Sequence, residues 1–253
     1  MPDHARQVRE RGFTLFEGLV AERKAASYVD TLATEWQRLG EPTLYDPEDR
    51  VISDGLRVSP VGLCWAGVLL IIPELARVLL HPELLDLLHE LLGPDLELEL
   101  GAGVLSDRDR GFFLWHHHVG GIDADDHRHA RPYPTFDRVE RVVCTLYGSP
   151  LDDQHGVMLI SPRRVGDNTA PPHRPGRDPW PGATELRAPR GSVVVFDQGT
   201  WHAVTPMRGP GQRAFFGFFV RRAGLAPTRR RDPSIVSALA SDARLDAAYR
   251  AAP

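Results

Sequence analysis

The sequence contains few lysines and few cysteines. Only Lys24 is a lysine among the 30 lysine and arginine residues, and Cys64 and Cys144 are the only cysteines. Two cysteines are too few for the disulfide framework of a small secreted domain, so we expect a protein of the reducing cytoplasm. The formal net charge is -4 and the pI is near 6.3. Without a positive excess, neither nucleic acid nor an anionic membrane is an expected partner.

Long hydrophobic runs are also missing. The longest, Val61 to Ile72, is shorter than the roughly 20 residues that span a bilayer, and it stops at Pro73. The opening residues Met-Pro-Asp-His-Ala-Arg lack the apolar core of a signal peptide. We therefore expect neither a membrane segment nor an export signal.

The first part of the chain, about residues 1–93, has mainly helical periodicity. Apolar residues recur at helical spacing between Val20 and Leu39, and proline stands near the first turn of two shorter helices, where its missing N–H costs nothing. The sequence thus predicts a short strand at Gly12 to Leu19, helices at Val20 to Leu39, Pro73 to Leu80 and Pro82 to Leu92, and a loop at Gly40 to Pro60.

After Pro94 the period changes from 3.6 to 2, and Leu96-Glu-Leu-Glu-Leu100 alternates as a half-buried strand does. Short strands with turn signals between them continue through residues 94–222, which indicates a sandwich or barrel. The predicted strands are Gly111 to His118, Val139 to Tyr147, Gly156 to Ser161, Gly182 to Ala188, Gly191 to Asp197 and Arg213 to Val220. We expect one domain over residues 1–253, with a long functional loop at Arg163 to Pro181 and a C-terminal helix within about residues 223–253, at Pro233 to Ala251.

Three consecutive histidines, His116, His117 and His118, end an aromatic-rich stretch that begins at Gly111. Alternate side chains of a strand share a face, so His116 and His118 point one way and His117 points the other way. Two imidazoles on one face of a buried strand can hold a transition metal. The pattern therefore indicates a metal site.

A second stretch, Pro189 to His202, matches the first: a tight turn feeds an apolar strand, and tryptophan again precedes the histidine (Trp115, Trp201). The chain then turns into a strand that starts at Arg213. If the turn closes a hairpin, His202 and Arg213 lie opposite each other, about 5 Å apart at Cα. An arginine entering an apolar strand needs an anionic partner, and its planar fork matches a carboxylate.

This ordered set of motifs resembles the phytanoyl-CoA dioxygenase-like family of Fe(II)/2-oxoglutarate-dependent oxygenases over most of residues 10–222. That family has helices before a double-stranded β-helix, a His-x-Asp pair on an early strand, a distal histidine and an arginine eleven residues later. His202 and Arg213 have that spacing, and Leu151 to Pro162 is similar to a further family segment. The resemblance implies a mainly β fold with flanking helices, whose core is a double-stranded β-helix (jelly-roll, cupin-like). It also implies Arg213 as the residue that binds 2-oxoglutarate.

The chain departs from the family at the aspartate. In the frame that starts at His116 the position holds His118, and in the frame that starts at His118 it holds Gly120. The first frame gives a metal site of His116, His118 and His202, which we favour because two of these histidines share a face. The second resembles the halogenases of this class, in which a small residue replaces the carboxylate. Alternatively, Asp123, Asp125 or Asp126 supplies a carboxylate.

The resemblance implies an oxidoreductase that uses Fe(II), 2-oxoglutarate and O2 to hydroxylate, or otherwise oxidise at C–H, a small molecule of the kind found in secondary metabolism. Trp115 and Trp201 are candidates for the substrate pocket. Two other readings stay open besides the halogenase. One is a three-histidine cupin-type dioxygenase that does not use 2-oxoglutarate, against which Arg213 argues. The other is a non-catalytic barrel that binds a small molecule or a metal.

Overall fold

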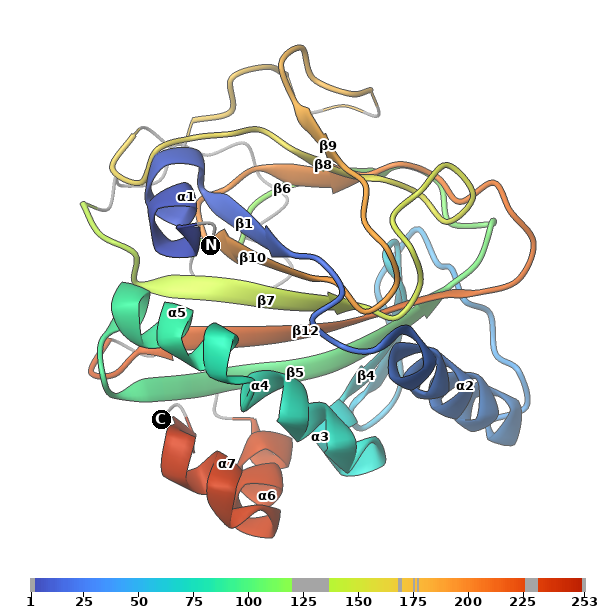
Figure 1. The fold of residues 1–253 in the computed structure, drawn as a ribbon. Helices are drawn as coiled ribbons and strands as arrows, with labels where there is room; N and C mark the ends of the chain where they lie inside the picture. Colours follow the sequence, from blue (N-terminus) through green and yellow to red (C-terminus); the bar gives the residue numbers. More distant parts are fainter. Residues whose placement is uncertain are drawn as a thin grey trace.

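Two β-sheets form the centre of the protein, and helices cover the outer face of the larger sheet in the computed structural model (Figure 1). The structure describes residues 3–119, 137–167, 170–174, 176, 178–225 and 232–251. All strand pairs in this part are antiparallel except β13 with β5. The fold is therefore mainly β with flanking helices, as the sequence predicts.

The larger sheet has the strand order β1-β10-β7-β12-β5-β4-β3-β2, and β13 pairs with β5 beside this path. Its longest ladder runs the length of β12 against β5. The strands are β1 (Phe13–Phe16), β2 (Arg50–Ser53), β3 (Leu56–Ser59), β4 (Gly62–Ala66), β5 (Leu96–Ser106), β7 (Arg141–Tyr147), β10 (Val193–Asp197), β12 (Arg213–Arg222) and β13 (Tyr249–Ala251).

The smaller sheet has the order β6-β11-β8-β9. Its strands are β6 (Phe113–His116), β8 (Met158–Ile160), β9 (Thr184–Leu186) and β11 (His202–Val204). It contributes Met158, Ile160 and Leu186 to an apolar layer that also contains Val143 and Phe219 of the larger sheet. The two sheets thus pack face to face, which is the arrangement of a β-sandwich.

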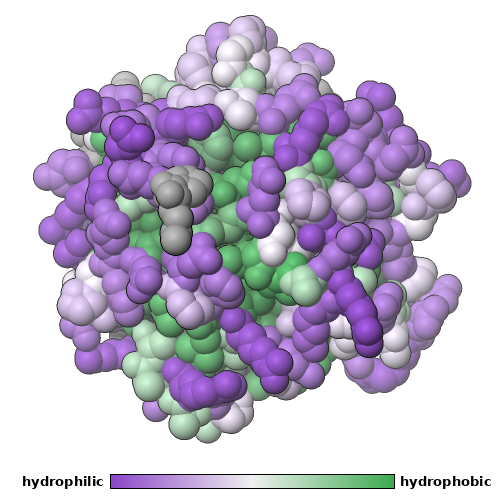
Figure 2. Space-filling view, in the orientation of Figure 1, coloured by the Kyte–Doolittle hydropathy of each residue, from purple (hydrophilic) through white to green (hydrophobic). Residues whose placement is uncertain are grey.

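Helices bury the other face of the larger sheet. They are α1 (His4–Arg11), α2 (Glu22–Arg38), α3 (Val68–Ile71), η1 (Pro73–Leu75), α4 (Ala76–Leu79), α5 (Pro82–Leu92), α6 (Pro233–Ser241) and α7 (Ala243–Ala248). Alternation along β12 serves both layers, because Phe216 and Phe218 face the helices while Phe219 faces the smaller sheet. On the side viewed in Figure 1, hydrophobic residues show in a strip between hydrophilic residues (Figure 2).

Gly103 of β5 lies where two helices come closest to the sheet. A Cβ there would stand 2.8 Å from Val68 of α3 and 3.1 Å from Leu32 of α2. Gly191 has a φ of +86° and a Cβ would collide with the carbonyl of Val20, so the predicted tight turn before β10 requires glycine. Among the described residues, no helix is both long enough and apolar enough to cross a bilayer.

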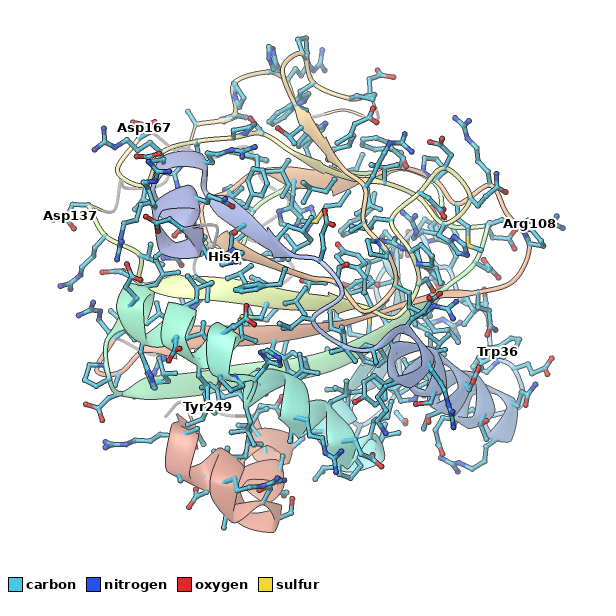
Figure 3. The ribbon with its side chains drawn as sticks, viewed as in Figure 1. His4, Trp36, Arg108, Asp137, Asp167 and Tyr249 are labelled. Atoms are coloured by element: carbon cyan, nitrogen blue, oxygen red, sulfur yellow. The ribbon has the colours of Figure 1, made fainter. Side chains whose placement is uncertain are left out.

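Three segments differ from the sequence-based expectations. Residues 40–60 are not all loop, because β2 and β3 lie within them. The predicted C-terminal helix is divided, since Asp242 ends α6 and its side chain caps the next helix by accepting from the backbone N–H of Arg244. The chain then leaves helical geometry at Tyr249, which is labelled in Figure 3 and donates a hydrogen bond of 2.8 Å to the Leu79 carbonyl.

The third difference concerns the alternating strand at the start of β5. Glu97 and Glu99 do not face solvent but are buried at 8% and 5% exposure. Arg221 lies 2.7 Å from Glu97 and 3.4 Å from Glu99, and Arg141 donates a 2.8 Å hydrogen bond to Glu99. Burial of a carboxylate is costly unless a positive charge lies beside it, and the two arginines supply that positive charge. We call these four residues the buried ion network.

Candidate metal and 2-oxoglutarate site

The predicted metal histidines come together at one end of the smaller sheet. His116 ends β6 and His202 begins β11, and the two are direct antiparallel partners. Their ring centroids are 4.1 Å apart, and the ring of His118 lies 5.0 Å from each. One ring nitrogen from each histidine lies within 4.8 Å of the others, and all three residues are buried. This is a geometry in which one transition-metal ion can contact all three imidazoles.

Backbone carbonyls fix the tautomers of two of these histidines. Nδ1 of His116 lies 2.8 Å from the Leu114 carbonyl, and Nδ1 of His202 lies 3.0 Å from the Thr200 carbonyl. A carbonyl only accepts, so Nδ1 carries the proton in both rings and Nε2 keeps its lone pair. Such second hydrogen bonds orient the histidine ligands of metals in proteins.

His118 lies just beyond the end of β6 and is held by its backbone. Its N–H donates a 2.8 Å hydrogen bond to the carbonyl of Gln198, in the turn after β10. The Gln198 side chain in turn accepts a 2.7 Å hydrogen bond from Arg141 of the buried ion network. Gln198 therefore connects the buried ion network to the segment that carries His118.

His117 points to the opposite side of the smaller sheet. It is fully buried, its ring lies 4.7 Å from that of Trp201, and its Nδ1 accepts a 3.2 Å hydrogen bond from the N–H of Val119. It is not a member of the histidine group. Strand alternation thus separates it from its two neighbours.

Arg213 lines the same cavity as the three histidines and is 1% exposed. Its guanidinium lies 5.5 Å from the ring of Tyr147 and 5.6 Å from that of Phe215. Nε and Nη2 have no hydrogen-bond partner within the described ranges. Burial lowers the pKa of Arg213, a direction that an anionic ligand would reverse. A carboxylate of a bound molecule would satisfy both N–H groups.

A second arginine, which the sequence-based reasoning did not single out, stands near the first. Arg110 is 1% exposed and donates to the carbonyls of Thr205 (2.7 Å) and Gly111 (3.1 Å). Burial, with the nearby charge of Arg213, lowers the pKa of Arg110 to about 9. Arg110 therefore remains a cation at neutral pH, and a guanidinium such as that of Arg213 is not deprotonated in proteins. Their combined charge makes this end of the cavity suited to an anion.

The hairpin expected between His202 and Arg213 does not form. β11 pairs with β6 and β8 in the smaller sheet, whereas β12 pairs with β5 and β7 in the larger one. The turn between them carries the chain from one sheet to the other. His202 and Arg213 nevertheless reach the same cavity, because they project from opposite sheets into the space between them.

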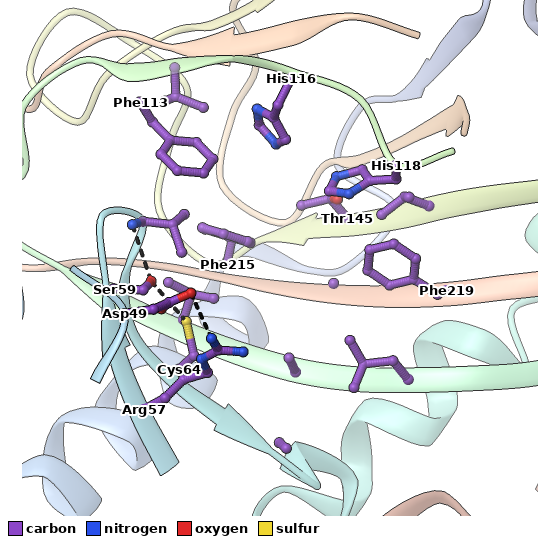
Figure 4. A pocket seen from close by; sticks show the side chains of 18 of the residues that line it. Asp49, Arg57, Ser59, Cys64, Phe113, His116, His118, Thr145, Phe215 and Phe219 are labelled. Carbon is purple, nitrogen blue, oxygen red and sulfur yellow. Dashed lines mark hydrogen bonds and ion pairs between the residues drawn. The ribbon is translucent and has the colours of Figure 1, made fainter. Parts of the chain in front are cut away.

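This cavity has a volume of about 390 Å³ and extends from the three histidines to β2, β3 and β4. Figure 4 shows His116 and His118 at one end, with Asp49, Arg57 and Ser59 at the other. Its walls are mainly apolar and include phenylalanines at positions 113, 196, 215 and 219. The rings of Phe113, Phe196 and Phe219 lie within 5.0 Å of the histidine rings. Of the strands that form the far end, β2 and β3 lie in the segment predicted to be a loop, so sequence periodicity gave no signal for their residues.

Trp115 and Trp201 do not line this cavity. They are 1% and 2% exposed and form a separate cluster with Trp180, whose ring stacks on Trp115 at 4.1 Å. A residue next to a cavity-facing histidine in a strand must face away, which places both tryptophans on the outer side of the smaller sheet. Trp180 comes from the predicted long loop, so the described part of that loop covers this outer side. Asp123, Asp125, Asp126 and Gly120 lie outside the described residues.

No model of a known protein family matches the chain, and no curated protein matches its sequence. Solved structures do share its fold. The non-haem alpha-ketoglutarate-dependent carbocyclase SnoK from nogalamycin biosynthesis aligns with a TM-score of 0.61 and 17% identity, covering 88% of this chain and 84% of SnoK. HygX from Streptomyces hygroscopicus, solved with nickel and 2-oxoglutarate, gives a TM-score of 0.56, 14% identity and coverages of 90% and 89%.

The non-haem monooxygenase ThoJ, solved as a nickel complex, aligns with a TM-score of 0.60 and 18% identity, over 91% of this chain and 81% of ThoJ. The chain thus has the jelly-roll fold that these non-haem enzymes share, and the predicted double-stranded β-helix core is confirmed. Membership of the phytanoyl-CoA dioxygenase-like family stays a prediction.

Proposed function

We propose that the protein is a non-haem Fe(II)/2-oxoglutarate-dependent oxygenase that oxidises a C–H bond of a small molecule. In this proposal His116, His118 and His202 bind iron, and Arg213 binds the distal carboxylate of 2-oxoglutarate. The observation that carries it is that three buried imidazoles and a buried arginine meet in one cavity, and that two N–H groups of this arginine have no partner in the part of the chain that the structure describes. The structural neighbours bind iron or nickel and 2-oxoglutarate, which supports the same cofactors here.

The donor set fits these groups. Neutral imidazole is a common ligand for iron, and a planar guanidinium matches a carboxylate. Bound iron and 2-oxoglutarate would together activate O2 for C–H oxidation. The Leu114 and Thr200 carbonyls would orient the histidine ligands, and Arg213 would anchor the co-substrate. The apolar walls would exclude water from the cavity.

Two features separate this function from its alternatives. Arg213 favours a 2-oxoglutarate enzyme over a three-histidine cupin-type dioxygenase, which has no carboxylate to anchor there. The close approach of all three histidines favours their joint use over a His118-x-Gly120 halogenase site. A non-catalytic barrel has no need of either arrangement.

The test is anaerobic addition of Fe(II) and then 2-oxoglutarate to the purified protein, while the visible charge-transfer band of the chelate is recorded. We expect a band in the wild type. Arg213→Ala should weaken 2-oxoglutarate binding by roughly 30-fold or more, as truncation of a buried charge pair costs about 2 kcal/mol or more. It should leave iron stoichiometry unchanged. Arg187→Ala, which removes an exposed arginine paired with Asp153, is the matched control.

Other outcomes point elsewhere. Bound iron without a band would favour the cupin-type dioxygenase, and no bound iron would favour a binding protein. A band that shifts on addition of chloride would favour halogenation.

A further inference from the structure

The end of the cavity opposite the histidines carries a small polar cluster that the proposed chemistry does not use. Arg57 of β3 and Asp49, which precedes β2, form an ion pair of 2.6 Å. Ser59 and Cys64 lie beside this pair and approach each other at 3.7 Å (Figure 4). We call these four residues the distal cluster. All four line the cavity.

The distal cluster presents hydrogen-bonding groups but no net charge. The carboxylate of Asp49 and the guanidinium of Arg57 neutralise each other, and burial raises the pKa of Cys64 to about 11, so its thiol is protonated at neutral pH. Asp49 is 19% exposed and Arg57 is 44% exposed, so this end lies towards solvent. A molecule bound here would find hydrogen-bonding partners. A charged group on that molecule would find no net opposite charge in the distal cluster.

Between the two ends the wall is apolar and aromatic. Apart from the distal cluster and the histidines, Arg213 is the only charged residue among the described residues that line the cavity. In the proposed function Arg213 is occupied by 2-oxoglutarate. A charged group on the substrate would therefore lose hydration without gaining an ion pair, which is costly.

We propose that the cavity selects a neutral, predominantly apolar, ring-bearing molecule with one hydrogen-bonding group. That group reaches the distal cluster while the carbon to be oxidised lies at the histidine end. The apolar body packs against Phe113, Phe215 and Phe219, and a hydroxyl or carbonyl oxygen meets Arg57 or Ser59. The direction in which this molecule lies in the cavity rests on the proposed function, because only that function makes the histidine end the place of reaction.

Four naphthalene derivatives test the proposal as matched probes: 2-naphthol, 2-methylnaphthalene, 2-naphthoate and 2-naphthylmethylammonium. Binding is measured by calorimetry under anaerobic conditions with Fe(II) and 2-oxoglutarate present. We expect 2-naphthol to bind most tightly. The methyl compound should bind roughly fivefold more weakly for want of a hydrogen bond. Both charged compounds should be weaker than 2-naphthol by about tenfold or more.

Two variants locate the selection at the distal cluster. Arg57→Gln removes the positive charge that pairs with the Asp49 carboxylate, so the preference should move about tenfold towards the ammonium compound. Asp49→Asn leaves the Arg57 guanidinium alone, so the preference should move by a similar factor towards 2-naphthoate. Both residues are partly exposed, and far-UV circular dichroism should show both variants folded. Arg187→Gln, at an exposed ion pair that does not line the cavity, should change none of these ratios.

The outcomes separate this proposal from the proposed function. Tightest binding of either charged probe by the wild type, equal or absent binding of all four, or unchanged ratios in both variants would overturn the substrate class. The chelate band is recorded in the same samples. A band together with failed selection would leave the oxygenase proposal standing, whereas selection without a band would leave the cavity's preference standing and remove the oxygenase.

Discussion

His116 and His202 are 86 residues apart in the sequence, yet they are direct partners across the β6–β11 ladder with ring centroids 4.1 Å apart. The pairing places both rings on one face of the smaller sheet, where His118 joins them. Because the strand register fixes this contact, the three imidazoles are preorganised before any metal binds. A preorganised set of donors loses little conformational entropy on binding.

We expect each of the three cavity-facing histidines to be needed for metal binding. His116→Ala, His118→Ala and His202→Ala should each abolish tight binding, whereas His117→Ala should keep it because that ring faces Trp201. Titration with Co(II), followed by its visible d–d absorption, measures this. His117→Ala should cost stability, about 1–3 kcal/mol, since the ring is buried. Equal loss of cobalt binding in all four variants would contradict the separation of faces.

Arg110 should strengthen 2-oxoglutarate binding without contacting iron. Replacement by glutamine removes a buried positive charge near Arg213, which should weaken binding by on the order of 1 kcal/mol, roughly fivefold in Kd. Titration of the iron-loaded protein with 2-oxoglutarate gives the Kd, and metal analysis gives the iron content, which should not change. An unchanged Kd in folded Arg110→Gln protein would show that the charge of Arg110 does not reach the site.

Trp115 should matter for stability rather than for ligand binding. Trp115→Ala removes the ring that stacks on Trp180 and should lower the free energy of unfolding by roughly 3–5 kcal/mol. Denaturant unfolding measures that loss. The 2-oxoglutarate affinity of the folded fraction should stay within about twofold of wild type, a difference of under 1 kcal/mol. A large loss of affinity at full folding would place Trp115 in the binding site after all.

Asp197 should make stability depend on pH in the acidic range. Burial raises the pKa of its carboxyl from 3.8 to about 6, although Arg163 lies 2.9 Å away. The folded state thus holds the proton more tightly than the unfolded state, so this contribution to stability is complete below about pH 4 and is lost as pH rises through about 6. The rise corresponds to roughly 3 kcal/mol.

Asp197→Asn should remove that contribution. Denaturant titration from pH 4 to pH 7 measures the unfolding free energy of wild type and variant. As pH rises over this range, the unfolding free energy of the wild type should fall by roughly 3 kcal/mol relative to that of the variant. A constant difference across this range would mean that Arg163 compensates the burial of the carboxylate.

The alternation of side chains between the two faces of a strand was the most informative sequence pattern. It separates His117 from His116 and His118. The same rule places Trp115 and Trp201, which the sequence suggests as pocket residues, away from the cavity. The spacing from His202 to Arg213 predicts that these two residues lie close together. Both do line one cavity, although the hairpin from which this was argued does not form. Local periodicity cannot show that a turn crosses between sheets, since that depends on contacts distant in sequence.

Other features were beyond a sequence-based reading for physical reasons. β2 is exposed along its whole length, so it has no buried face to produce an apolar period. Glu97 and Glu99 alternate with leucines as solvent-facing residues do, and their pairing with Arg221 and Arg141 offsets the cost of their burial. The distal cluster combines residues whose partners become evident only once β2, β3 and β4 are adjacent.

The distal cluster and the metal donors come from different parts of the chain, and this separation affects how the protein can change. Residues 49–66 build the polar end of the cavity, yet they include none of the three clustered histidines and not Arg213. β2 also ends its sheet, where added or altered residues disturb few neighbours. Exchanging this one contiguous segment would therefore be a route to new substrate preferences in laboratory evolution, with the three histidines and Arg213 left intact.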